Sequence, residues 1–316
     1  MNDMKSAADR KVIRDRHLYF GESPQVVKLL SAIDSVATKN TPILLEGETG
    51  TGKSLLARRI HEVSQRKGPF VSINCATFSQ NLLETELFGH TKGAFTGAKE
   101  ARAGLVASAK NGTLFLDEIG ELAPDLQPKL LHLLEDKVIR PVGSDVEQKT
   151  SVRIIAATNH HLKKLVKEGK FRADLFYRLN VIPFTAPSLR DRPDDIAGLS
   201  KSFITQLCEE HDLPIPTLSA NSLQALMAYP WPGNIRELRN HIERSLLLNL
   251  PLHEKLPIQN TTTSSNQDKR LATHEKKFIL HAIDESNGNK SKAALTLGIS
   301  RRTLDRKLKR WKELAA

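Results

Sequence analysis

Short apolar runs alternate with longer segments of helical periodicity between residues 18 and 185. Four runs rich in Ile, Leu, Val and Phe are predicted to be buried strands, at 42–46, 70–74, 112–117 and 152–157. Strands separated by helices in this way are typical of a mainly parallel sheet that helices cover on both faces. The pattern therefore predicts an α/β domain over residues 18–185.

The strand pattern stops after residue 185. Prolines separate short helical segments between residues 186 and 250, which predicts a small helical subdomain. Residues 251–272 contain a run of Thr, Ser, Asn and Gln with few large apolar side chains, as expected of a flexible linker. A compact helical domain is predicted over residues 273–316, and residues 1–17 are polar and aperiodic, as in a loose tail.

The composition fits a globular chain with two or three domains. Of 316 residues, 39% are hydrophobic and 26% are charged. No apolar run approaches the roughly 18 to 20 residues that span a bilayer, and the first residues lack the apolar core of a signal peptide. Cys75 and Cys208 are the two cysteines and have no metal-ligand spacing, so we expect a protein of the reducing cytoplasm.

Positive charge is concentrated at the C-terminal end of the chain. Residues 269–316 hold 13 Lys and Arg against 5 Asp and Glu, which accounts for most of the net charge of +11. Such a concentration predicts a polyanionic partner, with nucleic acid favoured over an anionic membrane surface.

The clearest chemical motif is a glycine-rich run between a predicted strand and a predicted helix. It reads Gly47, Glu48, Thr49, Gly50, Thr51, Gly52, Lys53 and Ser54. This context is that of a phosphate-binding loop, in which backbone N–H groups and a helix N-terminus surround the phosphates. We predict that Lys53 contacts the β- and γ-phosphates of ATP and that the Ser54 hydroxyl binds Mg²⁺.

Two carboxylates, Asp117 and Glu118, follow the strand predicted at 112–117. The carboxyl ends of parallel strands are where such a sheet places its ligand chemistry. We predict that Asp117 binds Mg²⁺ and that Glu118 polarises the attacking water. The alternative is a solvent-exposed acidic pair without a catalytic role, which the upstream phosphate-binding loop disfavours.

Residues 93–98 read Gly-Ala-Phe-Thr-Gly-Ala. The two glycines permit a sharp reversal and place Phe95 and Thr96 at its apex. An ordinary surface loop with a tucked-in Phe is the alternative. The segment resembles, letter for letter, the signature loop of the sigma-54-dependent transcriptional activators, a branch of the AAA+ ATPases also called bacterial enhancer-binding proteins. The resemblance implies that Phe95 and Thr96 contact sigma-54.

This resemblance covers residues from about 20 to 250 and from about 275 to 311 and implies further site residues. Asn74 would restrain Glu118, and Asn159 would read the γ-phosphate. Arg236 would be the sensor arginine of a helical lid. A neighbouring subunit would insert paired arginines into the site, and these are Arg172 and Arg178.

Three positions depart from the family pattern. Ser54 stands where Glu is usual, Thr91 replaces the Glu that usually precedes Lys-Gly-Ala-Phe, and Ala173 replaces an acidic residue between the two arginines. None of these changes removes a group with a direct chemical role, although Thr91 is expected to alter how the loop is held.

The C-terminal region has helix-turn-helix character. Gly298 ends one predicted helix and Ser300 can cap the next. Apolar residues of that second helix form an inward stripe and leave a basic face as the candidate DNA contact, formed by Arg301, Arg302, Thr303, Arg306 and Lys309. The segment resembles the Fis-type domain of the family. A basic, solvated helix in a small bundle is the alternative.

Together these features predict an AAA+ parallel-sheet ATPase domain with a helical lid and a small all-α DNA-binding domain. The resemblance implies an activator that binds enhancer DNA, assembles into a ring, as a hexamer in the family, and uses ATP and Mg²⁺ to remodel the sigma-54 RNA polymerase holoenzyme. An AAA+ unfoldase or clamp loader is disfavoured by the Phe-Thr loop and the DNA reader. A DNA-binding regulator with a relict ATPase domain is disfavoured by the intact nucleotide motifs.

Regulation is the remaining expectation from the sequence. Residues 1–17 are too short and too polar to form a receiver or sensory domain. We therefore expect control by a separate partner protein, by mixed assembly with a paralogue, or by the level of expression.

Overall fold

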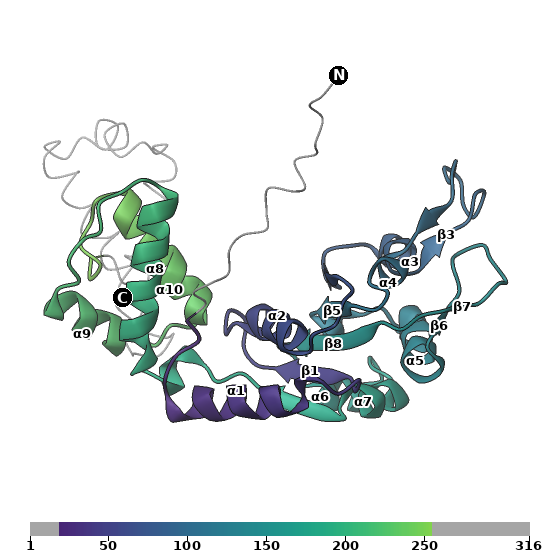
Figure 1. Ribbon diagram of the computed structural model, residues 1–316, viewed down its shortest axis with the longest axis horizontal. Coiled ribbons are helices and arrows are strands. Elements are labelled where there is room, and N and C mark those ends of the chain that lie inside the picture. Colours follow the sequence, from purple (N-terminus) through teal and green to yellow (C-terminus); the bar gives the residue numbers. More distant parts are fainter. Residues whose placement is uncertain (1–18, 255–316) are drawn as a thin grey trace, which may run out of the picture. The chain divides into compact units, whose positions relative to one another are not determined.

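The computed structural model describes residues 19–254 (Figure 1). The helices of the α/β part are α1 (Pro24–Ala37), α2 (Lys53–Val63), α3 (Gln80–Phe88), α4 (Leu105–Ser108), α5 (Gln127–Asp136), α6 (Leu162–Lys167) and α7 (Ala173–Leu179), with 3₁₀ turns η2 (Ile119–Glu121) and η3 (Pro124–Leu126). The strands are β1 (Ile43–Glu46), β2 (Phe70–Asn74), β3 (Gly89–His90), β4 (Arg102–Ala103), β5 (Thr113–Asp117), β6 (Val138–Ile139), β7 (Gln148–Lys149), β8 (Arg153–Thr158) and β9 (Ile182–Thr185).

A five-stranded sheet forms the centre of the α/β part, in the order β2-β5-β8-β1-β9, and every neighbouring pair is parallel. The four strands predicted from apolar runs are β1, β2, β5 and β8, each within one residue of its expected bounds. The fifth strand, β9, was not predicted. It contains Pro183 and alternates half-buried with exposed residues, because it is the edge strand beside β1.

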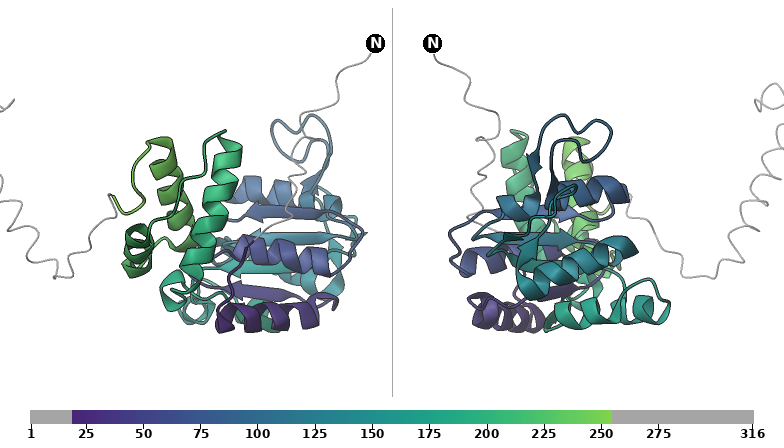
Figure 2. Two further views of the ribbon diagram at one scale, coloured as in Figure 1. Left: turned by 60° about the vertical axis from the view of Figure 1, so that its left-hand side comes forward. Right: turned by 90° about the vertical axis from the view of Figure 1, so that its right-hand side faces the viewer.

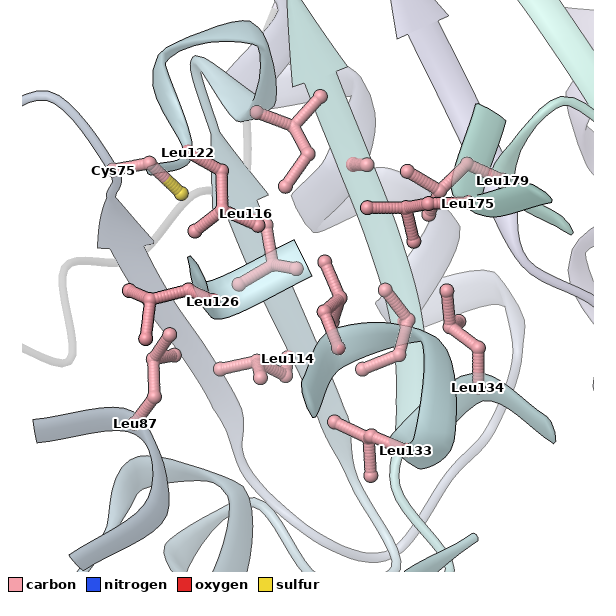
Figure 3. Close-up of a cluster of buried hydrophobic side chains, with 14 of the residues drawn as sticks. Cys75, Leu87, Leu114, Leu116, Leu122, Leu126, Leu133, Leu134, Leu175 and Leu179 are labelled. Atoms are coloured by element: carbon pink, nitrogen blue, oxygen red, sulfur yellow. The ribbon is translucent and has the colours of Figure 1, made fainter. Parts of the chain in front are cut away.

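Helices cover both faces of the sheet (Figure 2). Alternate strand residues such as Leu44, Leu114 and Ala156 pack against α3, α5, α6 and α7, and Figure 3 shows part of this cluster. Their sequence neighbours, such as Leu45 and Phe115, pack on the opposite face against α1 and α2. The two-residue period of the strands thus divides the continuous apolar runs between two cores.

Two small hairpins extend from the α/β part. β3 and β4 pair antiparallel and carry residues 91–101 between them, and β6 and β7 form the second hairpin. A parallel bridge between His90 and Val142 joins the two (Figure 1). The Gly-Ala-Phe-Thr-Gly-Ala loop is therefore part of an insertion between α3 and β5.

The predicted helical subdomain is present as η4 (Leu189–Asp191), α8 (Asp195–Glu210), α9 (Ala220–Ala228) and α10 (Asn234–Leu247). We call this part the lid. Its own core includes Trp231, which is 1% exposed and donates a hydrogen bond to Leu226 O at 2.8 Å. Both cysteines are buried and form no disulfide.

Several expectations fall outside the described residues. These are the N-terminal tail, nearly all of the linker at 251–272, and the DNA-binding domain at 273–316 with its candidate contacts Arg301, Arg302, Thr303, Arg306 and Lys309. Within residues 19–254, no helix has the length and apolar character needed to cross a membrane.

Candidate nucleotide-binding site

The carboxyl ends of β1, β5 and β8 bring the predicted nucleotide residues to one edge of the sheet. The phosphate-binding loop, Gly47–Ser54, follows β1 and leads into α2 at Lys53. Gly50 and Gly52 have φ angles of 81° and 99°, in the left-handed region that favours glycine. The loop curls around the N-terminus of α2, an arrangement suited to binding phosphate.

Lys53 lies inside this loop with a relative exposure of 6%. Its Nζ donates to Gly47 O at 2.8 Å and to Glu48 O at 3.1 Å. Burial lowers the pKa of Lys53, and the charge of Arg236 lowers it further, whereas Glu118 and Asp117 oppose the shift. The ammonium group is thus held where phosphate oxygens would enter.

Ser54 and Asp117 approach each other beside the loop. The Ser54 hydroxyl donates to Asp117 Oδ2 at 3.5 Å. Hydroxyl and carboxylate oxygens are ligands that Mg²⁺ accepts, and the ion usually completes its shell with water and substrate phosphates. No cluster of three or more acidic, His or Cys ligands occurs in the described part of the chain. The pair fits a magnesium ion held jointly with a nucleotide.

Glu118 is connected to the loop through Asn159. Its Oε2 accepts a hydrogen bond from Asn159 N at 3.2 Å, and Asn159 Nδ2 donates to Thr49 Oγ1 at 3.1 Å. Glu118 itself has a φ of 51°, an unfavourable left-handed conformation for a residue with a Cβ. Such strain is commonly found at functional sites. The structure therefore places Glu118, Asn159 and the loop in contact with one another.

Asn74 lies beside Asp117, its register partner across β2 and β5. Its Oδ1 accepts from Ala76 N at 2.8 Å, and no hydrogen bond within residues 19–254 joins it to Glu118. The neighbouring Cys75, expected from the sequence to be a reduced cysteine, is buried beside this strand end. Burial raises its pKa to about 12, with smaller contributions from Asp117 and Glu118, so its thiol stays protonated.

Arg172 and Arg178 do not contact this chain's phosphate-binding loop through any hydrogen bond of the described residues. Arg172 precedes α7 and pairs with Asp174, with Nη2 and Oδ2 separated by 2.7 Å. Arg178 Nη2 is 3.5 Å from Leu134 O. Neither arginine completes the site from within its own subunit.

Two lid residues contact the loop and were not singled out from the sequence. Asn234 donates to Glu48 and to Thr49 O, and Arg190 forms an ion pair with Glu48.

A narrow cavity of about 50 Å³ lies beside Gly52, with Phe20, Leu55 and Phe203 among its lining residues. Arg236, predicted as the sensor, is exposed on the first turn of α10.

The Phe-Thr loop is held by a ring contact of Phe95 and by hydrogen bonds of Thr91, whose backbone N donates to Val142 O at 3.0 Å. The Phe95 ring meets the edge of His90 with centroids 5.1 Å apart, yet 46% of Phe95 is exposed. Thr91 Oγ1 donates to Gly143 O at 3.0 Å, in the turn between β6 and β7. Gly93 has a φ of 81°, as the predicted reversal requires. The unusual threonine thus fastens this loop to the second hairpin.

Three known protein families match consecutive parts of this chain. The sigma-54 interaction domain matches residues 19–185, the AAA+ ATPase lid domain matches residues 190–271, and the bacterial regulatory protein, Fis family, matches residues 270–311. The three matches follow one another along the chain and together extend from residue 19 to residue 311.

Individual relatives of this chain are bacterial regulatory proteins. The chain is 42% identical over 306 residues to the regulatory protein AtoC of Escherichia coli, covering 92% of this chain and 66% of AtoC. It is 43% identical to the transcriptional regulatory protein ZraR of Salmonella typhimurium, covering 92% and 68%. It thus spans about two thirds of the length of these curated relatives.

A solved structure shows the likeness in three dimensions. NtrX of Brucella abortus in complex with ATP superimposes with a TM-score of 0.74 at 34% identity, covering 93% of this chain and 68% of that chain. The matching domain models, the curated relatives and this structure are consistent with one another. The chain belongs to the family of sigma-54-dependent transcriptional activators, with an AAA+ ATPase domain, a lid and a Fis-type DNA-binding domain.

Proposed function

We propose that this protein hydrolyses ATP to remodel the sigma-54 RNA polymerase holoenzyme and so allow promoter opening. The observation that carries the proposal is the exposed Phe95 on an insertion that continues through β4 and α4 into β5. The same strand ends at Asp117, beside Glu118. A change at the nucleotide site can therefore reach the loop along the chain, through β5, α4 and β4.

The chemistry at the nucleotide site is assigned to this chain's own groups. The loop N–H groups and Lys53 bind and orient the phosphates. Ser54 and Asp117 would hold Mg²⁺, which supplies charge neutralisation at the phosphates when bound. Glu118 accepts a proton from the attacking water, and Asn159 keeps its carboxylate aimed at the loop.

Asn74 is proposed to restrain the Glu118 carboxylate by a hydrogen bond that forms in only one nucleotide-bound state. The register of β2 and β5 places Asn74 one residue from Glu118. In that state the Asn74 amide would leave Ala76 N and bond to the glutamate carboxylate instead. This restraint would link the water-activating group to the α3 segment that follows β2 and leads to the Phe-Thr loop.

Self-association completes the proposed site. Arg172 and Arg178 would enter the nucleotide site of a neighbouring subunit and stabilise charge in the transition state. Beside them, Tyr177 is 72% exposed and Val181 is 51% exposed, as expected of an apolar surface that a second copy covers. A closed ring, hexameric as in the family, would give every subunit a complete site.

The remaining partners follow from the family. The Fis-type domain would bind double-stranded enhancer DNA, through its basic residues. We place the protein in the cytoplasm, where its promoter DNA is found.

Capture of sigma-54 tests the proposal. The purified chain is mixed with sigma-54 in the presence of ADP and aluminium fluoride, which mimics the transition state of hydrolysis. We expect a stable complex with the wild type, none with Phe95→Ala, and an undiminished complex with the control Phe78→Ala, which truncates another partly exposed phenylalanine. Equal capture by both variants would remove the assigned role of the loop.

A further inference from the structure

The outward side of the phosphate-binding loop is bonded to residues that follow β9. Three successive loop carbonyls accept hydrogen bonds: Thr49 O from Asn234 Nδ2 at 3.0 Å, Gly50 O from Arg236 N at 3.3 Å, and Thr51 O from Arg192 Nη2 at 3.4 Å. A loop that turns its N–H groups toward an anion turns its carbonyls away from it, and these carbonyls need partners. The lid side of the chain supplies all three.

Asn234 is the central residue of this contact. It is fully buried and has a φ of 52°, which asparagine tolerates better than most residues. Its Oδ1 accepts from Leu189 N at 2.8 Å, while its Nδ2 also donates to Glu48 Oε2 at 3.1 Å. Every part of the side-chain amide is therefore engaged by the loop or by η4 of the lid.

Glu48 is the charged partner of Asn234. Its carboxylate receives both Nη atoms of Arg190, with Nη1 and Oε2 separated by 2.8 Å. The hydrogen bond from Arg190, and then that from Asn234, lowers the pKa of Glu48, so the carboxylate stays ionised. A carboxylate facing the nucleotide would repel its phosphates, whereas here the side chain is committed to the lid. Only the backbone of Glu48 remains available to the ligand.

The position of this contact matters for Arg236. Helix α10 begins at Asn234, so Arg236 lies on its first turn, two residues from the point of attachment. The charge of Arg236 already lowers the pKa of Lys53. A shift of Asn234 relative to the loop would therefore displace the guanidinium of Arg236 relative to the phosphates.

We propose that Glu48, Arg190 and Asn234 form a clasp that joins the phosphate-binding loop to the lid and sets the position of Arg236 during hydrolysis. Glu48 and Asn234 are positioning residues, because they act through Arg236 and the loop backbone. When the loop closes on phosphates, the clasp carries its displacement into α10. The position of the lid thus depends on whether a nucleotide is bound and on which nucleotide it is.

The two contacts of the clasp differ in strength, since one is buried and the other is exposed to solvent. Asn234 is buried, and its removal would leave Leu189 N–H and Thr49 O without their partners. Glu48 and Arg190 are half exposed, at 43% and 47% of their side-chain surface, so water and salt weaken their attraction. The exposed pair can therefore be altered without disturbing the core, and Arg190→Gln is the safest variant.

The first experiment separates positioning from binding. Steady-state ATPase kinetics of the full chain are measured for Glu48→Gln, Arg190→Gln and the double variant, with Glu46→Gln as a control that removes a carboxylate at the end of β1. We expect kcat to fall about tenfold with KM changed less than about threefold, because ground-state binding is retained. The double variant should be no worse than the more affected single variant.

The second experiment follows the lid directly. Trp231 is buried in the lid core, and its carbonyl accepts from Asn234 N at 2.8 Å. In a Trp311→Phe background, Trp231 is the remaining tryptophan of the chain. We expect ATP to change its fluorescence in the control and to leave it unchanged in Glu48→Gln, although both proteins bind the nucleotide by titration calorimetry.

Several results would overturn the clasp. Unchanged kcat in Glu48→Gln and Arg190→Gln would do so, as would independent, multiplying losses in the double variant. A persisting Trp231 signal in Glu48→Gln would show that the lid responds by another route. If KM rises as much as kcat falls, the carboxylate serves nucleotide binding instead. Equal melting temperatures of the variants exclude a general loss of folding.

Discussion

The chain carries two glycine-framed loops, and their glycines are required for different reasons. In the phosphate-binding loop, a Cβ on Gly50 would collide with the Gly233 carbonyl oxygen of the lid. In the Phe-Thr loop, a Cβ on Gly93 or Gly97 would meet no atom within 4 Å. Gly50 is thus required both by its left-handed φ and because the lid packs on it. The Phe-Thr loop needs only the left-handed conformation, which leaves its surface free for a partner.

The same contrast holds for the side chains. Lys53 is 6% exposed and bonded within its loop, whereas Phe95 is 46% exposed and touches one ring edge. A binding site for a small charged ligand is preorganised by many contacts, while a loop that engages a large partner keeps few. Substitutions in the phosphate-binding loop should therefore abolish ATP hydrolysis. Substitutions in the Phe-Thr loop should leave hydrolysis intact and prevent remodelling of the sigma-54 holoenzyme.

The largest expected effects are at the nucleotide site. Lys53→Ala should abolish measurable nucleotide binding, because loss of one buried charge partner costs about 2–5 kcal/mol. Glu118→Gln should retain binding and lose hydrolysis by about 10²–10⁴-fold, since it removes a general base. Nucleotide titration and phosphate release on both variants measure the two effects. Normal turnover in Glu118→Gln would remove its assigned role.

A pair of glycine substitutions tests the comparison itself. Gly50→Ala adds a collision with the lid to the strain of its φ of 81°, whereas Gly97→Ala has only the strain of its φ of 108°. That strain is worth roughly 1–2 kcal/mol at each site. We expect Gly50→Ala to lose nucleotide binding and to melt at a lower temperature, and Gly97→Ala to keep its ATPase activity. Equal losses would contradict the distinction.

Thr96→Ala should separate the two loops functionally. Thr96 has no hydrogen bond to the nucleotide residues within the described range, so its ATPase activity should stay within about twofold of the wild type. Open-complex formation at a sigma-54 promoter should be lost, because the loop tip is the proposed contact. Permanganate footprinting of the promoter gives the readout. Wild-type opening by this variant would show that the apex is dispensable.

The smallest expected effect is at Thr91. Thr91→Val keeps the shape of the side chain and removes the hydrogen bond to Gly143 O, worth about 0.5–1.5 kcal/mol. We expect a few-fold rise in sigma-54 capture without the transition-state analogue, because the loop is held less tightly when only the backbone bond from Thr91 N to Val142 O joins Thr91 to the second hairpin. Thr91→Ser, which restores the hydroxyl, should return capture to the wild-type level. An unchanged Thr91→Val protein would show that the backbone bond of Thr91 and the contacts of His90 are the main restraints.

Local sequence determined the elements and the chemical groups of this protein. β1, β5 and β8 were found within one residue because they are central strands, whose burial on both faces makes them continuous apolar runs. The phosphate-binding loop was equally evident, since its glycines, lysine and serine are adjacent in the chain. Edge strand β9 was missed because its half-exposed, proline-containing pattern resembles a connection between elements.

Only the tertiary structure decided which distant residues share a contact. Asn234 and Glu48 are 186 residues apart in sequence, and Thr91 and Gly143 are 52 apart, so no local pattern links either pair. The left-handed backbone of Glu118 and Asn234 is likewise imposed by surrounding contacts, because neither residue adopts it by preference. Composition and spacing select the groups that can react, and packing of the lid and hairpins selects how those groups are held.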